Sequence, residues 1–201
     1  MRLFALIVFI VAGAVRAEEP PEARPAPTPT SEAARLGAEY FVQRAGAAWV
    51  YQGAKGRGRV GINSFVEWRA HFSYAVAGKS GSGVWRVKDG VWLERAAGRS
   101  EHEAVVLPAR MTRGTRWTAA ASIERGGGGT AQYEVVALEA VVELPNGLTV
   151  EHCLAVLETG EGVGPYTHYY APNMGKVAVD GPNGWVYRLV EFHSGGRGHS
   201  E

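Results

Sequence analysis

Short runs in which apolar and polar residues alternate recur along the chain from Glu39 to His193. Gly, Pro and Asn separate these runs, and no window shows the roughly 3.6-residue periodicity of an amphipathic helix. The pattern predicts strands near 47–52, 59–76, 83–88, 91–96, 101–107, 115–124, 132–144, 148–158, 166–171, 175–179 and 185–192. We therefore expect an all-β domain, an antiparallel meander of hairpins that forms a curved sheet, a sandwich or a partly open barrel.

The strongest local signal is the dipeptide Asn146-Gly147 between two apolar runs. Asn-Gly is typical of a type I′ turn, which would place Cys153 opposite Ala140. Because side chains alternate between faces, this register predicts a core face made of Val136, Leu138, Ala140, Val142, Leu144, Thr149, Glu151, Cys153, Ala155 and Leu157. The other face should be only half covered, and it carries Glu139, Glu143, His152, Glu158, Val135, Val141, Val150, Leu154 and Val156.

A second hairpin is predicted around Asp89-Gly90, with Trp85 paired with Glu94. Two indoles then share one sheet face. We predict that they line a concave apolar surface together with two tyrosines of a segment that is poor in charge; the four residues are Trp85, Trp92, Tyr169 and Tyr170. Such a surface is either core, covered by the opposite sheet, or the wall of a ligand-binding site.

A short repeat indicates that the domain is built from two similar halves. Gly46-Ala-Ala-Trp49 recurs as Gly114-Thr-Arg-Trp117, and each copy stands at the start of a β-rich stretch. The two copies predict sheets or half-barrels that both begin with a turn glycine and an anchoring tryptophan.

The amino-terminal residues have the pattern of a secretory signal peptide. Arg2 precedes an apolar run, and Val15 and Ala17 suit a cleavage site that leaves Glu18 first. An uncleaved short anchor is the alternative. We predict a signal peptide over 1–17, a Pro-rich linker over 18–38 that could include a short helix near 31–36, a single β domain over 39–193 and a flexible tail over 194–201.

The charge composition argues against some classes of binding partner. Cleavage would remove Arg2 and Arg16 from 21 basic residues, leaving 19 against 20 acidic ones. A near-neutral, mixed charge argues against nucleic-acid binding and against a strongly anionic membrane surface. No segment after the signal peptide is apolar enough to span a membrane. The single cysteine, Cys153, rules out an internal disulfide and is expected to be a small buried hydrophobe.

No catalytic residue, metal ligand or cofactor motif is predicted. The only aspartates, Asp89 and Asp180, precede turn glycines, and the sequence has no Gly-x-Ser-x-Gly nucleophile elbow. The glycines of Gly56 to Gly61 open no helix and therefore form no dinucleotide site. The histidines lack zinc-site spacing; they are His71, His102, His152, His168, His193 and His199. The glutamates Glu139 and Glu143 are expected on a solvated face.

Several motifs together resemble exported, β-rich bacterial envelope proteins of unknown function. The motifs are the two Gly-x-x-Trp openings, the hairpin Pro145-Asn-Gly147 that leads to Cys153-Leu-Ala-Val156, and the segment Tyr169-Tyr-Ala-Pro172-Asn-Met-Gly175-Lys-Val177. The resemblance covers residues 40–192. It implies a β-rich fold and a periplasmic or extracellular location, and it brings no catalytic residues.

These observations favour a non-catalytic, exported β domain that binds a lipid, a lipoprotein or an envelope protein partner. One alternative is a hydrolase whose glutamates and histidines meet only in three dimensions. Another is a structural or adhesive module without a deep cavity. A Glu–His or Glu–Glu pair within hydrogen-bond reach at the floor of a pocket would favour the enzyme. The sequence indicates neither the ligand nor the oligomeric state.

Overall fold

A computed structural model describes residues 33–76, 78–97, 103–122, 129–160 and 164–195. The described chain is almost entirely β, which confirms the predicted fold class. Its strands are β1 (Arg35–Leu36), β2 (Ala47–Gly53), β3 (Gly56–Val66), β4 (Arg69–Val76), β5 (Lys79–Lys88), β6 (Val91–Ala96), β7 (Ala104–Leu107), β8 (Arg110–Met111), β9 (Arg116–Ala120), β10 (Thr130–Glu143), β11 (Thr149–Thr159), β12 (Tyr166–Ala171), β13 (Gly175–Gly181) and β14 (Gly184–Ser194). A single-turn 3₁₀ helix, η1, spans Gly37–Tyr40.

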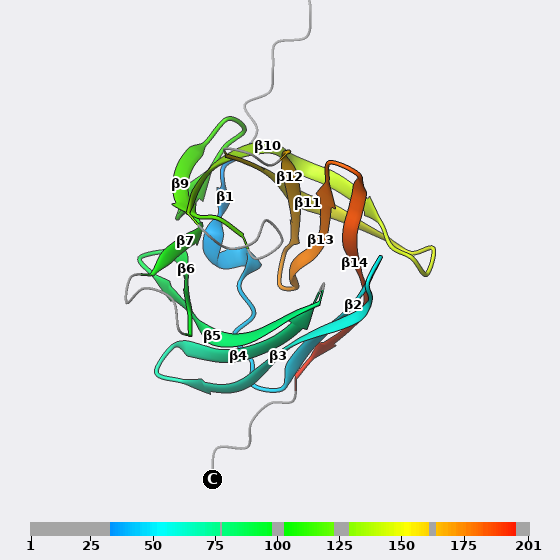
Figure 1. Cartoon of the computed structure of the whole chain (residues 1–201). Helices are drawn as coiled ribbons and strands as arrows, with labels where there is room; N and C mark the ends of the chain where they lie inside the picture. Colours follow the sequence, from blue (N-terminus) through cyan, green and yellow to red (C-terminus); the bar gives the residue numbers. More distant parts are fainter. Residues whose placement is uncertain (1–32, 77, 98–102, 123–128, 161–163, 196–201) are drawn as a thin grey trace, which may run out of the picture. The chain divides into compact units, whose positions relative to one another are not determined.

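Twelve of these strands form one antiparallel sheet that is nearly closed into a barrel (Figure 1). We call this sheet the ring. Its strand order is β7-β6-β5-β4-β3-β2-β14-β13-β12-β11-β10-β9, and β1 and β8 form a separate two-stranded sheet. Of the three predicted architectures, a curved sheet, a sandwich and a partly open barrel, the structure has the partly open barrel.

The ring consists of two consecutive meanders, β2–β7 and β9–β14, which we call the first half and the second half. A backbone ladder between β2 and β14 joins them on one side. On the other side the edge strands β7 and β9 are neighbours without a ladder among the described residues. We call this second junction the seam.

The predicted Gly-x-x-Trp repeat stands at the start of each half. Gly46 and Gly114 both have positive φ, 77° and 85°, a backbone conformation that favours glycine. Trp49 lies beside Phe192 of β14, with ring centroids 5.6 Å apart. Trp117 donates its indole hydrogen to the carbonyl oxygen of Val105 on β7, at 3.3 Å. The two tryptophans therefore lie at the two junctions between the halves.

The hairpin at Asp89-Gly90 has the predicted geometry. Both residues have positive φ, 52° and 79°, as a type I′ turn requires. Trp85 pairs with Glu94 and Val87 with Trp92, which confirms the predicted register.

The type I′ turn predicted at Asn146-Gly147 is wrong. Of these two residues only Gly147 has positive φ, and the turn is closed by Gly147 N donating to Leu144 O at 3.0 Å. Pro145 is one reason, because its fixed negative φ suits the first central position of a type I turn. The loop is thus one residue longer than expected, and Thr149 pairs with Glu143 instead of Leu144.

Bulges then change which residues face inward along β10 and β11. The register shifts at three places, and His152 has a positive φ of 57° at one of them. The shifts restore the predicted pair of Ala140 and Cys153. Toward the carboxyl-terminal end of β11 the residues pair differently from the prediction, and Leu157 pairs with Glu134. The predicted half-covered face is therefore wrong for Val135, Leu154, Val156 and Glu158, all of which are buried.

Two further segments differ from the predicted pattern. The run 59–76 is two strands, β3 and β4, which reverse at Glu67 and Trp68 with positive φ at both. Neither residue type signals such a turn. The described end of the predicted helix near 31–36 is the strand β1, and the helical turn η1 follows it. The predicted signal peptide, most of the linker and most of the tail lie outside the described residues.

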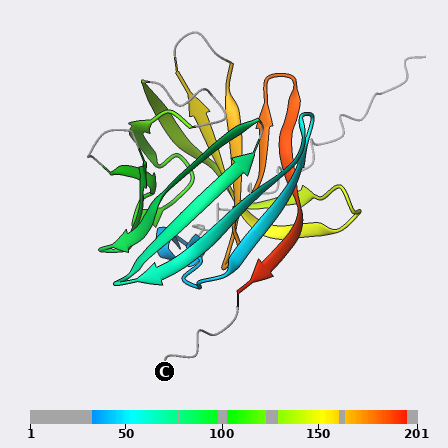
Figure 2. The ribbon, with the colours of Figure 1, turned by 60° about the horizontal axis from the view of Figure 1, so that its bottom comes forward.

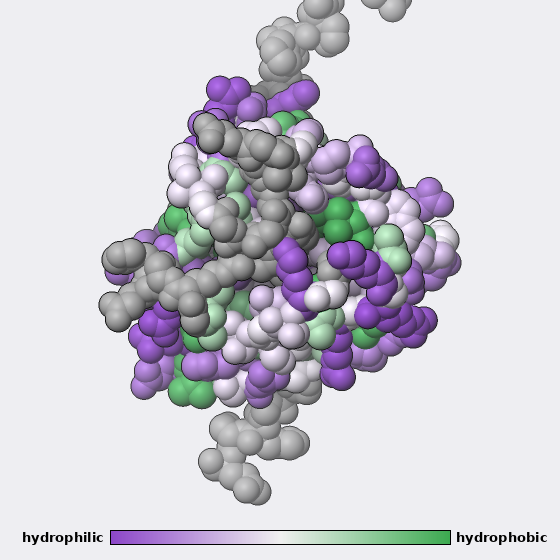
Figure 3. Space-filling view, viewed as in Figure 1, coloured by the Kyte–Doolittle hydropathy of each residue, from purple (hydrophilic) through white to green (hydrophobic). Residues whose placement is uncertain are grey.

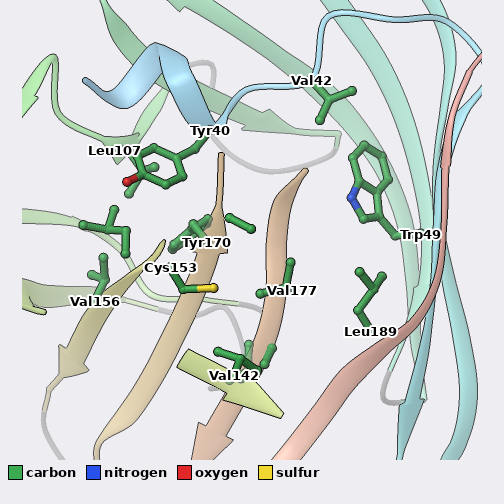
Figure 4. Close-up of a cluster of buried hydrophobic side chains, with 14 of the residues drawn as sticks. Tyr40, Val42, Trp49, Leu107, Val142, Cys153, Val156, Tyr170, Val177 and Leu189 are labelled. Atoms are coloured by element: carbon green, nitrogen blue, oxygen red, sulfur yellow. The ribbon is translucent and has the colours of Figure 1, made fainter. Parts of the chain in front are cut away.

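The segment η1 lies within the ring of strands in the view of Figure 1. Tyr40 is fully buried, and Phe41 packs against Trp92 with ring centroids 5.7 Å apart. Asn173, in the turn between β12 and β13, donates its backbone hydrogen to Glu39 O at 2.8 Å. Figure 4 shows Tyr40 beside Leu107, above the strands that carry Cys153 and Tyr170. The segment therefore fills the end of the ring at which this turn lies.

The outer surface is mixed. On the face seen in Figure 3, hydrophilic residues are interspersed with small groups of apolar ones. Figure 2 shows the β10–β11 hairpin projecting beyond its neighbours. Arg188 of β14 donates to Glu143 O, next to the turn of this hairpin, at 2.7 Å. Within the described ranges there is no helix with the length and apolar character needed to cross a membrane.

Candidate ligand cavity inside the ring

A cavity of about 180 Å³ lies inside the ring. Every strand of the large sheet except β11 contributes to its wall, and aromatic side chains make up much of it: Trp49, Tyr51, Phe72, Tyr74, Trp85, Trp92, Tyr133, Tyr170 and Tyr187. This arrangement follows from the alternation along each strand, which turns one set of side chains toward the interior.

Trp85 is the centre of an aromatic cluster in the first half. Its ring stacks on Phe72, with centroids 4.0 Å apart and planes 16° apart. Trp49 and Trp92 meet it edge-on, at 6.1 Å and 5.7 Å. The indole nitrogen of Trp85 donates to Glu94 Oε2 at 2.9 Å, which fixes the ring in its plane. The first half therefore supplies a flat, apolar and rigid wall.

Three of the four predicted site residues line the cavity together: Trp85, Trp92 and Tyr170. The rings of Trp92 and Tyr170 meet at 5.9 Å in a T-shaped contact. Tyr169 is not among the lining residues, and its hydroxyl donates to Asp180 Oδ2 at 3.3 Å. The reason is alternation, since consecutive residues of β12 face opposite sides of the sheet. Burial and the neighbouring Asp180 carboxylate raise the pKa of Tyr169.

A buried polar pair in the second half was not predicted. Glu158 of β11 and His168 of β12 are 0% and 1% exposed, and Glu158 Oε2 lies 2.8 Å from His168 Nε2. The backbone hydrogen of Ser122 is donated to the other carboxylate oxygen, Oε1, at 2.9 Å. Burial alone would raise the pKa of Glu158, but the hydrogen bonds from His168 and Ser122 outweigh it and hold the pKa below its ordinary value.

Tyr133 lies directly opposite Glu158 in the ladder between β10 and β11. Its hydroxyl donates to Ala120 O at 2.8 Å, and its ring stacks on Trp117 with centroids 5.4 Å apart. Burial and then the Glu158 carboxylate raise the pKa of Tyr133, so its hydroxyl stays protonated. Tyr133 therefore connects the polar pair to the seam.

Two buried polar atoms of the cavity wall have no hydrogen-bond partner within the described part of the chain. They are the Nδ1 atom of His168 and the indole Nε1 of Trp92, which is 4% exposed. Buried polar groups in proteins are nearly always bonded, so an unpartnered atom calls for an explanation. The two atoms are therefore open to a molecule that would donate to His168 Nδ1 and accept from Trp92 Nε1.

A positive charge also lies at the wall. The ammonium group of Lys176 stands 5.8 Å from the centroid of the Tyr170 ring, a cation–π distance. Lys176 lines the cavity together with Glu94 and His168, so charges of both signs border the apolar space.

Cys153 has the predicted structural role. It is fully buried opposite Ala140 and is not among the residues that line the cavity. Burial raises the pKa of its thiol to about 11, so it is a poor nucleophile at neutral pH. Among the residues that the structure describes, no group of three or more His, Cys, Asp or Glu side chains could hold a metal ion.

Searches of protein-family models, of curated proteins and of solved structures found no match. The resemblance of residues 40–192 to exported envelope proteins therefore stays a prediction, and function has to be argued from the cavity.

One signal in the sequence could have indicated part of the site. His168 is two residues from Tyr170, so both must face the same side of β12. Placing Tyr170 at a ligand-binding wall therefore also places His168 there and excludes Tyr169. No comparable signal exists for Glu158, because its inward position depends on the bulges between β10 and β11.

Proposed function

We propose that the protein is a non-catalytic binding protein that holds a small, mainly apolar molecule inside the ring. The observation that carries the proposal is the aromatic cavity whose wall includes two buried, unpartnered polar atoms. Ligand sites in proteins combine such apolar walls with a few polar groups that orient the ligand.

The volume sets the size of the ligand. A cavity of about 180 Å³ is comparable with the roughly 150 Å³ engineered cavity that binds benzene. It suits a molecule with one ring, or the end of an acyl chain. Of the three partners predicted from sequence, a lipid is therefore supported only through such a chain end. An exported, cell-envelope location remains part of the proposal.

The proposal can be tested by filling the cavity. Ala96 lines it on the same face of β6 as Trp92 and Glu94, so Ala96→Leu should occupy part of the space. The matched control is Ala75→Leu, since Ala75 is exposed on β4 between the lining residues Tyr74 and Val76. We expect toluene to bind the native protein and Ala75→Leu with similar affinity and Ala96→Leu at least roughly tenfold more weakly.

Binding would be followed by titration calorimetry and by the change in tryptophan fluorescence. Failure of toluene, phenol and indole to bind the native protein would contradict the proposal.

An acid–base enzyme is the second candidate, because Glu158 and His168 do meet within hydrogen-bond reach at the cavity wall. In that function Glu158 would orient His168, whose Nδ1 would take a proton from water or substrate. Turnover of a small aryl ester that is abolished by His168→Gln would favour the enzyme. Ester that binds and is released unchanged would favour the binding protein.

A further inference from the structure

The polar pair indicates the chemical class of the ligand. Resting on the proposed binding function, we propose that the cavity selects a neutral, ring-sized molecule with a hydroxyl group, and that this hydroxyl donates its hydrogen to Nδ1 of His168.

The contacts of Glu158 determine which nitrogen of the His168 ring carries the hydrogen. The Oε1 atom of Glu158 accepts from the backbone hydrogen of Ser122, and Oε2 faces Nε2 of His168 at 2.8 Å. The lowered pKa of Glu158 keeps its carboxylate ionised at neutral pH. An ionised carboxylate can only accept hydrogen bonds, so Nε2 must carry the hydrogen.

The other ring nitrogen of His168, Nδ1, is then a hydrogen-bond acceptor. In a neutral imidazole with hydrogen on Nε2, Nδ1 is an acceptor. This nitrogen is buried and has no partner within the described part of the chain, although the ring lies at the cavity wall. A buried acceptor without a partner destabilises the empty cavity, and a ligand donor would remove that cost. The ligand must therefore bring an O–H or N–H group.

The charged groups at the cavity wall limit the charge of the ligand. A carboxylate would turn its lone pairs toward the Nδ1 lone pair and would add a negative charge beside Glu158. A cation would be opposed by Lys176, which stands over the Tyr170 ring. A neutral hydroxyl avoids both costs. The stacked and edge-on rings around Trp85 then offer flat surfaces to the apolar part of the molecule.

Size-matched probes test the donor. Phenol and toluene have nearly the same shape, and only phenol has a hydroxyl group. We expect the native protein to bind phenol at least roughly tenfold more tightly than toluene, as one recovered buried hydrogen bond allows. Anisole can accept from the indole hydrogen of Trp92 but cannot donate to His168, so it should bind more weakly than phenol.

The variant Glu158→Gln should invert this preference. Its amide oxygen should remain on the Ser122 backbone hydrogen, because that donor needs an acceptor, and its amide nitrogen then faces Nε2 of His168. Nε2 must then accept, so the hydrogen moves to Nδ1, which becomes a donor. Anisole should then gain over ethylbenzene, and phenol should lose most of its advantage. Glu94→Gln is the control, because it removes a charge from the cavity wall without touching His168. It should change the affinities for phenol and toluene by the same factor, and likewise those for anisole and ethylbenzene.

Nitrogen NMR of the His168 ring gives a readout that needs neither ligand nor variant. We expect hydrogen on Nε2 in the native protein. Hydrogen on Nδ1 would overturn the inference, and so would equal affinity for phenol and toluene, while the proposed function would survive in either case. If none of the four probes binds, the inference and the proposed function both fail.

Discussion

The two halves of the ring share an architecture and differ in chemistry. Each is a meander of consecutive strands that begins with a positive-φ glycine and a tryptophan at a junction, Trp49 in the first half and Trp117 in the second. The first half lines the cavity with the stacked and edge-on rings around Trp85. The second half contributes the buried pair of Glu158 and His168.

This difference indicates a division of roles. Rings supply contact area and shape but little orientation, whereas one fixed acceptor orients a ligand and adds little area. Under the proposed binding function, the first half would thus set the shape of the ligand and the second half its orientation. Substitutions in each half measure whether the halves differ in energy as they do in structure.

The largest expected effect separates the two junction tryptophans. Trp49 is fully embedded in the core, so Trp49→Ala should lower the free energy of unfolding by about 3–5 kcal/mol. Trp117 is half-buried at the seam, and Trp117→Ala should cost only about 1–2 kcal/mol. Urea denaturation measures both. Trp68→Ala is the control, since that side chain is 72% exposed. Equal losses at Trp49 and Trp117 would show that the two junctions are energetically equivalent.

A smaller effect concerns Glu158 and acid. A carboxyl group whose pKa is lowered by folding stabilises the protein above its ordinary pKa, near 4.5, and loses that contribution as the pH falls through the folded value. Glu158→Ala should therefore cost about 2–3 kcal/mol at pH 7, and the gap to the native protein should narrow as the pH is lowered below about 4.5. Urea denaturation at each pH provides the measurement, with the exposed Glu151→Ala on the same strand as control. A gap that stays constant down to pH 3 would contradict the hydrogen-bonded, ionised state of Glu158.

The smallest expected loss of stability is at Cys153, in the apolar part of the second half. Cys153 lies on the same strand as Glu158 but belongs to the apolar core. Cys153→Ala should cost only about 1 kcal/mol, because little volume is lost. The buried thiol, with its pKa raised to about 11, should react with a thiol reagent slowly in the folded protein and quickly in urea. Equal rates in both states would show that the Ala140–Cys153 register is wrong.

The fold class and most strands could be predicted because alternation and turn signals agree along most of the chain. Asp89-Gly90 is a hairpin with two flexible central residues and no bulge, so its register follows from the sequence. At Asn146-Gly147 the preceding proline selects a different turn, and bulges then shift the ladder. The register error begins at this turn, where Thr149 pairs with Glu143, and the bulges then change it, so that the predicted Ala140–Cys153 pair is kept while the residues on either side of it pair differently.

In the candidate site, too, some residues could be predicted from local patterns and others could not. Trp85 and Trp92 could be placed on one face because they flank a turn whose geometry follows from two residues. Tyr170 could be separated from Tyr169 by alternation alone. The contact between Glu158 and His168 depends on the accumulated register of β10, β11 and β12, a long-range property that no local pattern records.

The seam between β7 and β9 affects how the cavity can change its width. Elsewhere around the ring, a row of backbone hydrogen bonds resists any increase in circumference. Across the seam the described residues form no ladder; Trp117 donates a hydrogen bond to Val105, and its ring stacks on Tyr133 of its own half. The seam is thus the most compliant line of the ring, where an occupant slightly too large would be accommodated first and where the barrel would widen with the least mechanical work.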